Sequence, residues 1–178
     1  MATRRLFTAI EPPESFISKV TDLHTGLPGA NWESRPHITL SHFGDVDEKR
    51  MTDLLAALGA VTFESFDLEV QQLRTFGEPS APTVVWLGLE DSPELARLQV
   101  QLTEVRSEFA ATPDRHGGFT PHITLARTQQ AKPADVAEYL RSGMDRNRVG
   151  GFHVGAFELF ESIDFTYERM QSFSAVGG

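Results

Sequence analysis

Two copies of one five-residue word, Pro-His-Ile-Thr-Leu, occur nearly half a chain apart, at Pro36–Leu40 and Pro121–Leu125. In each copy the histidine precedes the threonine by two positions, so on a β-strand both side chains project from the same face. Imidazole has an unperturbed pKa of about 6.5 and can accept or donate a proton near neutral pH. If the two halves of the chain pack as related lobes, the two histidines can share one cleft as general base and general acid.

The polar side chains near the two histidines favour a phosphate-bearing substrate. Thr39 and Thr124 can donate hydroxyl hydrogen bonds to non-bridging phosphate oxygens, and Arg127 adds a permanent cation. Arg127 lies five positions after His122, so regular strand alternation places it on the opposite face. Its side chain would have to curl round, or the strand must have ended. These groups together predict the cleavage of a phosphoester without a metal ion.

A metal site is one alternative use of two histidines. Neither word contains an Asp or Glu that could complete a coordination shell. The remaining histidines do not form a ligand spacing: they are His24, His42, His116 and His153. The chain has no cysteine, which excludes disulfides, thiolate zinc sites and cysteine nucleophiles. We therefore expect no metal and no cofactor.

The elements that must position the two words follow a mixed order. Periodicity predicts helices at 14–26, 47–60, 93–110 and 134–143 and strands at 6–10, 35–43, 66–76, 83–89, 120–127, 152–160 and 167–176. Helix–strand alternation interrupted by strand–strand steps is typical of an α+β fold rather than a doubly wound sheet. We expect residues 1–178 to form one domain of two lobes with mostly antiparallel sheets, each lobe contributing one His-x-Thr motif.

The composition limits the partners. The chain of 178 residues has 25 acidic and 16 basic side chains, a formal charge of −9. Coating a long nucleic acid requires many cationic phosphate contacts, so this class of protein is disfavoured, whereas a small phosphate ligand at one local basic site is compatible with the charge. No segment resembles a signal peptide or a membrane span. We expect a cytoplasmic monomer with no membrane partner.

These residues resemble the two-histidine (2H) phosphoesterase superfamily and, within it, the bacterial and archaeal RNA 2′,3′-cyclic phosphodiesterases, historically called 2′–5′ RNA ligases. The second word in its context, Phe119–Arg127, is very similar to the second motif of that family. The resemblance extends over nearly the whole chain. Its other segments are Arg5–Ile10, Arg35–Val46, Val85–Gly88 and Phe157–Ser162.

The resemblance implies a bilobal, pseudo-symmetric fold with helices outside and the active site in a central cleft. It also implies hydrolysis of a 2′,3′-cyclic phosphate, on an RNA 3′ end or a nucleotide, to a 2′-phosphate. By this resemblance His122 activates water, His37 protonates the leaving 3′-oxygen, and Thr39, Thr124 and Arg127 hold the phosphate. The direction of proton transfer rests on the resemblance, because either assignment of the two histidines satisfies the chemistry.

The chain departs from the family just after the first word. The family usually has an aromatic residue in a Phe-Leu-Gly context, where this sequence reads His42-Phe43-Gly44. We expect His42 or Phe43 to contact the substrate, with either ring able to stack on a base. Trp32 is a further candidate for stacking or for the core. Four loop side chains are candidates for contacts to RNA phosphates or are simply solvated: Arg115, His116, Arg146 and Arg148.

Two other functions remain open from the residues alone. One is a phosphodiesterase acting on another cyclic phosphate or on a 2′–5′-linked oligonucleotide, with RNA ligation as the reverse chemistry. The other is a module that binds RNA ends without turnover. The intact His/Thr pairs favour an enzyme over a binding module, because binding alone does not require two proton-transfer groups.

Overall fold

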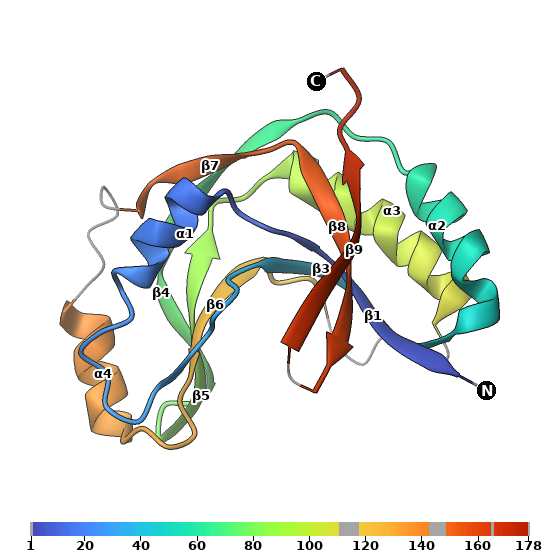
Figure 1. Ribbon diagram of the computed structural model, residues 1–178. Helices are drawn as coiled ribbons and strands as arrows, with labels where there is room; N and C mark the ends of the chain where they lie inside the picture. Colours follow the sequence, from blue (N-terminus) through green and yellow to red (C-terminus); the bar gives the residue numbers. More distant parts are fainter. Residues whose placement is uncertain (1, 111–117, 143–148, 165, 178) are drawn as a thin grey trace.

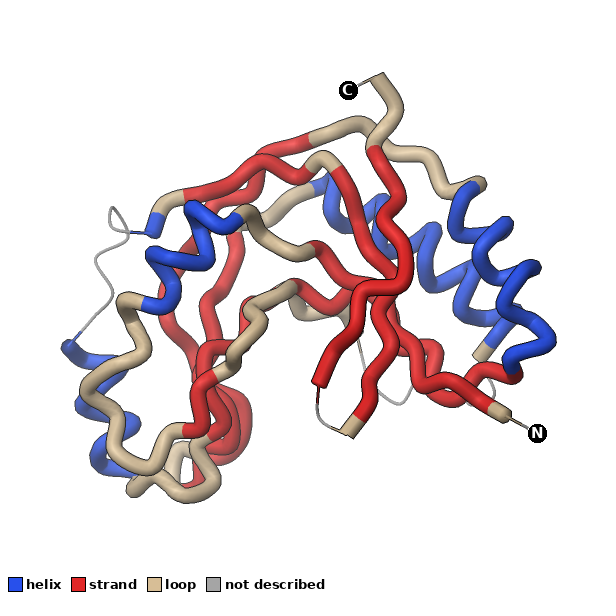
Figure 2. The backbone as a smooth tube through the Cα atoms, viewed as in Figure 1, coloured by secondary structure: helices blue, strands red, loops and turns tan. Residues whose placement is uncertain are grey.

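The strands form two antiparallel sheets. The computed structural model describes residues 2–110, 118–142, 149–164 and 166–177. Its strands are β1 (Thr3–Ile10), β2 (Asn31–Trp32), β3 (Ile38–Asp47), β4 (Phe66–Glu78), β5 (Ala81–Leu89), β6 (His122–Arg127), β7 (Gly151–Val154), β8 (Ala156–Ile163) and β9 (Thr166–Ser174). One sheet has the order β3-β1-β8-β9 and the other the order β2-β6-β5-β4-β7. Figures 1 and 2 show them as the two limbs of an arch.

The helices lie on the outside of both limbs. They are α1 (Glu14–Thr21), a 3₁₀ turn η1 (Glu48–Arg50), α2 (Met51–Gly59), α3 (Pro93–Phe109) and α4 (Pro133–Ser142). Figure 1 shows α2 and α3 side by side against the four-stranded sheet, and α1 and α4 beside the five-stranded sheet. This arrangement confirms the predicted α+β class. None of these helices is long and apolar enough to cross a membrane.

Helix α3 begins and packs as its sequence predicts. The Ser92 side chain accepts a hydrogen bond from the Leu95 backbone amide, and Pro93 occupies the first turn, where its missing amide hydrogen is not needed. The predicted apolar stripe includes Leu98 and Leu102, which are both completely buried. The cap fixes where α3 begins, and the apolar stripe determines which side of the helix contacts the sheet and which side remains exposed.

The chain passes from one sheet to the other several times. The predicted strand at 152–160 is in fact two strands, β7 and β8, separated by Gly155. Strand β7 pairs with β4, whereas β8 pairs with β1 and β9, so the break at Gly155 lets the chain change sheets. Strand β2 is only two residues long and pairs with β6, and the sequence pattern did not predict it. Each sheet therefore contains segments from both halves of the sequence.

The apolar residues of the two repeated words anchor both central strands in the core. Ile38 and Leu40 of β3 are 0% and 3% exposed, and Ile123 and Leu125 of β6 are both 0% exposed. All four belong to one hydrophobic cluster that extends through both sheets. This confirms the prediction that the isoleucine and leucine of each word face inward, and it leaves the histidine and threonine on the other face.

Candidate active site

Both His/Thr pairs line one cavity. It has a volume of about 840 Å³ and is bounded by residues of both sheets, including His37, Thr39, His122, Thr124 and Arg127. Strands β3 and β6 contact each other, although they belong to different sheets. The structure thus brings together the two words that lie nearly half a chain apart. A cavity of this size falls in the range that holds a small ligand.

A β-bulge in β3 decides which side chain follows the first His/Thr pair into the cavity. Thr39 pairs with Ala9 and Ser41 with Thr8, so Leu40 is an extra residue. His42 consequently pairs with Phe7, which lies on the same face of β1 as Ala9. Regular alternation would place Ser41 beside Thr39, but the bulge places His42 there instead. His42 lines the cavity as a result.

Strand β6 has the same bulge at the equivalent position. Thr124 pairs with Trp86 and Ala126 with Val85, so Leu125 is the extra residue. Arg127 then pairs with Val84, on the same face of β5 as Trp86. Arg127 therefore enters the cavity directly. The expectation that its backbone faces away was wrong, because the count of five positions assumed an unbroken strand.

The two imidazoles are held by equivalent hydrogen bonds. Nδ1 of His37 lies 2.8 Å from the Arg35 carbonyl oxygen, and Nδ1 of His122 lies 2.7 Å from the Thr120 carbonyl oxygen. A carbonyl oxygen can only accept, so Nδ1 carries the hydrogen in both rings. In the neutral ring this leaves Nε2 as the proton acceptor. Each carbonyl belongs to the residue before Pro36 or Pro121, a position that proline restricts to extended backbone.

Comparison with known protein families identifies a match over most of the chain. The sequence model described as the 2′-5′ RNA ligase superfamily matches residues 11–164. The chain belongs to this superfamily. The match confirms the resemblance that the two His-x-Thr words indicated, and it covers the segments that supply both histidines.

Curated relatives in the superfamily include two archaeal proteins named RNA 2′,3′-cyclic phosphodiesterase. The one from Aeropyrum pernix is 32% identical over 142 residues, covering 79% of this chain and 80% of the relative. The one from Archaeoglobus fulgidus is 29% identical over 164 residues, covering 89% of this chain and 91% of the relative. A crystal structure of E. coli LigT complexed with 3′-AMP has a TM-score of 0.75 at 20% identity. The alignment covers 98% of this chain and 99% of LigT, so the fold is shared.

Burial is the largest influence on the pKa of both histidines of the repeated words. It lowers the pKa of His37 below its ordinary value, and the nearby His122 acts in the same direction. The carboxylates of Glu33 and Glu11 and the hydrogen bond to the Arg35 carbonyl oppose this effect. Burial also lowers the pKa of His122, opposed by its hydrogen bond to the Thr120 carbonyl. The two rings therefore differ in their carboxylate neighbours.

Aromatic rings pack against each imidazole. The ring centroid of His37 lies 5.4 Å from that of Phe7 and 5.2 Å from that of Tyr167. The ring centroid of His122 lies 5.0 Å from that of Phe76 and 5.5 Å from that of Trp86. Such contacts restrict the ring orientations and keep water from one side of each imidazole.

An ion-pair cluster supports the loop before His37. The Arg35 guanidinium forms two hydrogen bonds with the Glu11 carboxylate and also donates to the Tyr167 carbonyl oxygen at 2.9 Å. Arg35 stacks 4.8 Å above the centre of the Phe160 ring. The backbone carbonyl of the same Arg35 accepts from His37, so the cluster holds the group that orients the imidazole.

Several sequence candidates lie elsewhere. Phe43 does not line the cavity: it is 1% exposed and packs in the core, so the prediction that it contacts substrate is corrected. Trp32 is partly buried against the core and stacks on His24 at 4.8 Å, as the core alternative predicted. The four loop candidates lie outside the described residues: Arg115, His116, Arg146 and Arg148.

Ten of the sixteen described residues that line the cavity were absent from the sequence prediction, among them Arg5, Glu33, Phe76 and Tyr167. Arg5 and Phe7 both line the cavity because they are two positions apart on β1 and therefore share a face. The others come from segments whose approach to the cavity depends on the tertiary fold. Among the residues that the structure describes, no group of three or more His, Asp or Glu side chains is arranged to hold a metal ion.

Proposed function

We propose that this protein hydrolyses the terminal 2′,3′-cyclic phosphate of RNA to a 2′-phosphate, using its two histidines and no metal ion. The observation that supports this most strongly is the pair of matching imidazoles in one cavity, each with Nδ1 bound to a carbonyl and Nε2 left for proton transfer. The names of the curated relatives support the choice of substrate.

In the proposed reaction, Nε2 of His122 takes a proton from water as the water oxygen bonds to phosphorus. The bond from phosphorus to the 3′-oxygen breaks, and Nε2–H of His37 donates its proton to that oxygen. The product carries a 2′-phosphate and a 3′-hydroxyl. His122 ends protonated and His37 neutral, so proton exchange with solvent restores the starting state.

Two carboxylates distinguish the surroundings of His37 from those of His122. A general acid must be protonated before the reaction, and carboxylates stabilise an imidazolium. Glu33 and Glu11 raise the pKa of His37 against the larger effect of burial. For His122, the effect found among the described residues that raises the pKa is the hydrogen bond to the Thr120 carbonyl. The carboxylates thus act to keep His37 protonated, whereas burial lowers the pKa of both rings, so the assignment of His37 as the acid follows the family resemblance.

The remaining polar groups of the cavity suit a reacting phosphate. The hydroxyls of Thr39 and Thr124 can donate to the two non-bridging oxygens, one from each strand. The guanidinium of Arg127 can stabilise the charge that develops on the phosphorane-like transition state. His42 can add a contact to the substrate from the other lobe, since it lines the same cavity.

Product analysis tests the proposal directly. Purified protein in excess EDTA is incubated with an oligoribonucleotide ending in a 2′,3′-cyclic phosphate. We expect conversion to the 2′-phosphate, identified by comparison with synthetic 2′- and 3′-phosphate standards. A 3′-phosphate product would overturn the assignment of the leaving group. Loss of turnover in EDTA, restored by added metal, would overturn metal independence, and binding without turnover would favour the end-binding module.

A further inference from the structure

A second hollow adjoins the catalytic cavity. Its volume is about 850 Å³, and it shares Thr39, His42, Phe76 and His122 with the cavity. It is also lined by residues of α3 and by Phe119, from the segment before the second word. Because four residues border both spaces, the cavity and this groove form one continuous depression. We call the second space the α3 groove.

The side chains of the α3 groove suit a nucleoside rather than a phosphate. Helix α3 contributes Gln99, Val100, Thr103 and Glu104, and the Gln99 amide donates to the Thr103 hydroxyl at 2.8 Å. Val100 is 54% exposed, which is high for a valine. No lysine or arginine is among the described residues that line the groove. Apolar surface and neutral hydrogen-bonding groups accept a base and a ribose, whereas Glu104 repels phosphate.

Two partly exposed aromatic rings border the space. Phe76 stands between the cavity and the groove, and Phe119 lies within the groove. A base can stack on either ring with little dependence on its identity, since every base has a π-face. The groove is thus equipped for a nucleoside without a built-in sequence preference.

The border between the two spaces is fixed by a buried cation. Nε of Arg106, on α3, donates to the His42 backbone carbonyl at 2.6 Å, and Arg106 is 8% exposed. This bond ties the bulged part of β3 to α3. The His42 imidazole is consequently held at the point where a strand leaving the cavity would enter the groove.

We propose that the α3 groove binds the nucleoside that precedes the terminal nucleotide of the RNA, with the connecting phosphodiester passing His42. This inference rests on the proposed function, since it assumes that the terminal cyclic phosphate occupies the catalytic cavity. The lining residues of α3 extend over six positions, from Gln99 to Glu104, or about 7.5 Å of helix. The groove therefore takes one nucleoside, in keeping with a chain whose charge of −9 disfavours a long RNA track.

Substrate length provides the first test. We compare kcat/KM for a nucleoside 2′,3′-cyclic phosphate with that for a dinucleotide and a tetranucleotide ending in the same group. The proposal predicts a gain of about tenfold from one to two nucleotides, because stacking of one base is then added. From two to four nucleotides we expect little further gain. Absence of turnover with all three substrates would reject the proposed function instead.

Opposite charge changes in the groove provide the second test. Val100→Glu adds a carboxylate at an exposed position beside Glu104, and we expect it to abolish most of the dinucleotide advantage. Glu104→Lys replaces an exposed acid by a cation, and we expect it to increase that advantage. Both effects should weaken in high salt, because they act through charge on an exposed surface.

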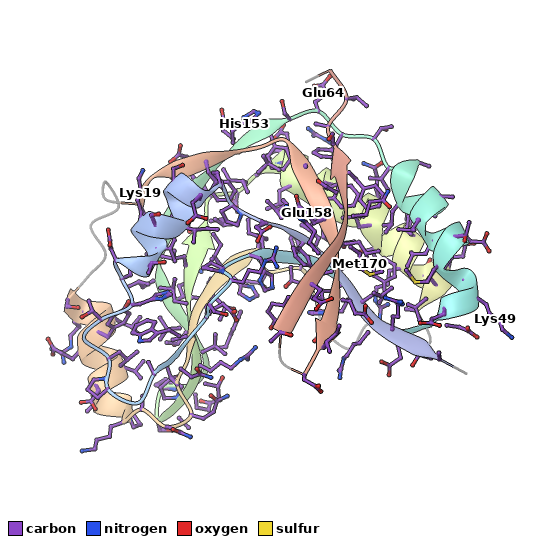
Figure 3. All side chains as sticks on the ribbon, in the orientation of Figure 1. Lys19, Lys49, Glu64, His153, Glu158 and Met170 are labelled. Atoms are coloured by element: carbon purple, nitrogen blue, oxygen red, sulfur yellow. The ribbon has the colours of Figure 1, made fainter. Side chains whose placement is uncertain are left out.

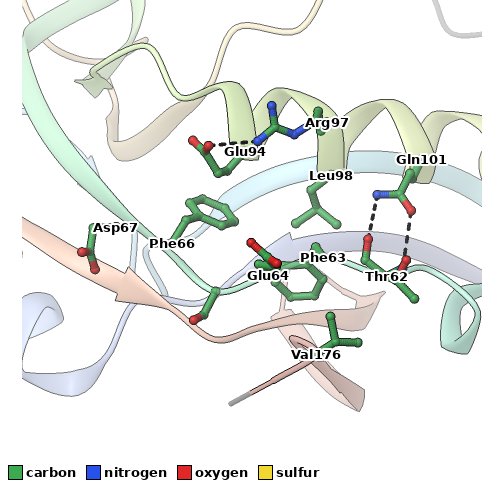
Figure 4. Close-up of a pocket in the computed structure, with 11 residues that line it drawn as sticks. Thr62, Phe63, Glu64, Phe66, Asp67, Glu94, Arg97, Leu98, Gln101 and Val176 are labelled. Carbon is green, nitrogen blue, oxygen red and sulfur yellow. Dashed lines mark hydrogen bonds and ion pairs between the residues drawn. The ribbon is translucent and has the colours of Figure 1, made fainter.

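Val176→Glu is the matched control. Val176 is 53% exposed, close to the value for Val100, but it lines a separate pocket of about 580 Å³ between α3 and the C-terminal segment. Figure 4 shows this pocket, with Val176 near Phe63 and opposite Gln101. We expect Val176→Glu to leave the ratio of dinucleotide to mononucleotide kcat/KM unchanged. Equal ratios in the wild type, Val100→Glu and Glu104→Lys would overturn the proposal while leaving the proposed function intact.

Discussion

The two strands that carry the repeated words, β3 and β6, share the same local arrangement. Each has a histidine, a threonine two positions later, an extra leucine that forms a bulge, and a third cavity-lining residue five positions after the histidine. The Nδ1 hydrogen bonds are also equivalent, to a carbonyl two residues earlier in each case. The repeated unit therefore runs for six residues from the histidine and ends two positions beyond the identical word.

The two units differ at their fifth and sixth residues, and the sixth is the one that lines the cavity. It is His42 in the first unit and Arg127 in the second. A guanidinium remains charged at every accessible pH, whereas an imidazole is charged only in acid. One lobe thus places a permanent cation at the cavity, and the other places an imidazole ring there. Two strands with the same backbone arrangement can therefore place chemically different groups on the two sides of one cavity.

The first test of the comparison removes each imidazole. We expect His37→Ala and His122→Ala each to lower kcat by about 100-fold or more, because each removes one proton-transfer group. The assay follows a 2′,3′-cyclic phosphate substrate at saturating concentration. Near-wild-type turnover in either variant would break the equivalence of the two units.

His153→Ala is the control for these two variants. The His153 side chain is 61% exposed and bonds only to Asp67 among the contacts found for it. Figure 3 shows it on the outer edge of the arch, on β7. We expect its removal to leave kcat unchanged, so a general effect of losing a histidine would be visible in this variant.

The second test compares the sixth residues. With a mononucleotide substrate at pH 8, we expect Arg127→Ala to lower kcat/KM by about 100-fold and His42→Ala by tenfold or less. We expect this because a guanidinium carries a permanent charge that can stabilise the transition state, whereas an imidazole can contribute a hydrogen bond. Arg127→Lys should retain part of the activity because the charge remains. Equal losses of kcat/KM in the two alanine variants would show that the guanidinium and the imidazole contribute equally to activity.

Much of this plan could be predicted from sequence because it is local. The i, i+2 spacing in Pro36–Leu40 and Pro121–Leu125 settles which side chains share a face, and burial of the isoleucine and leucine settles which face is inward. The start of α3 was equally predictable, since Ser92 and Pro93 act within one turn.

The bulges could not be predicted, because a bulge is a property of two strands. Leu40 and Leu125 become extra residues only through the register with β1 and β5. The placements of His42 and Arg127 follow from that register, and so does the burial of Phe43. The change of sheet at Gly155 also depends on which partner strands are available. Residues far apart in sequence decide these features.

The third test concerns the carboxylates that distinguish the two histidines. Glu33→Gln removes a negative charge that raises the pKa of His37, while the Gln oxygen can still accept from the Arg35 amide. The pKa of His37 should fall further. If His37 is the acid, the basic limb of the kcat/KM profile should move to lower pH and the acidic limb should stay in place. The two limbs belong to the coupled pair, so the shift is read from the whole curve.

Glu138→Gln is the control for this change, because Glu138 is an exposed acid on α4 that pairs with Arg141. It should leave both limbs in place. A shift of the acidic limb in Glu33→Gln would reverse the assigned roles of the two histidines. If neither limb shifts, Glu33 does not contribute to the electrostatic difference between His37 and His122.

The smallest expected effect is on stability. Burial lowers the pKa of His37 in the folded chain, so the unfolded chain binds this proton at a higher pH than the folded chain does. The favourable contribution is complete above pH 6.5 or so and is lost as the pH falls through the folded-state pKa. In His37→Gln this loss disappears. Each unit of pKa difference corresponds to on the order of 1 kcal/mol.

Denaturant unfolding at pH 7.5 and pH 5.0 measures this effect. We expect the free energy of unfolding to fall less on acidification in His37→Gln than in the wild type, with His153→Ala matching the wild type. The corresponding change in His122→Gln should have the same sign, because burial lowers the pKa of that ring too. If acidification destabilises the wild type and both glutamine variants equally, protonation of these two imidazoles does not contribute to the loss of stability in acid.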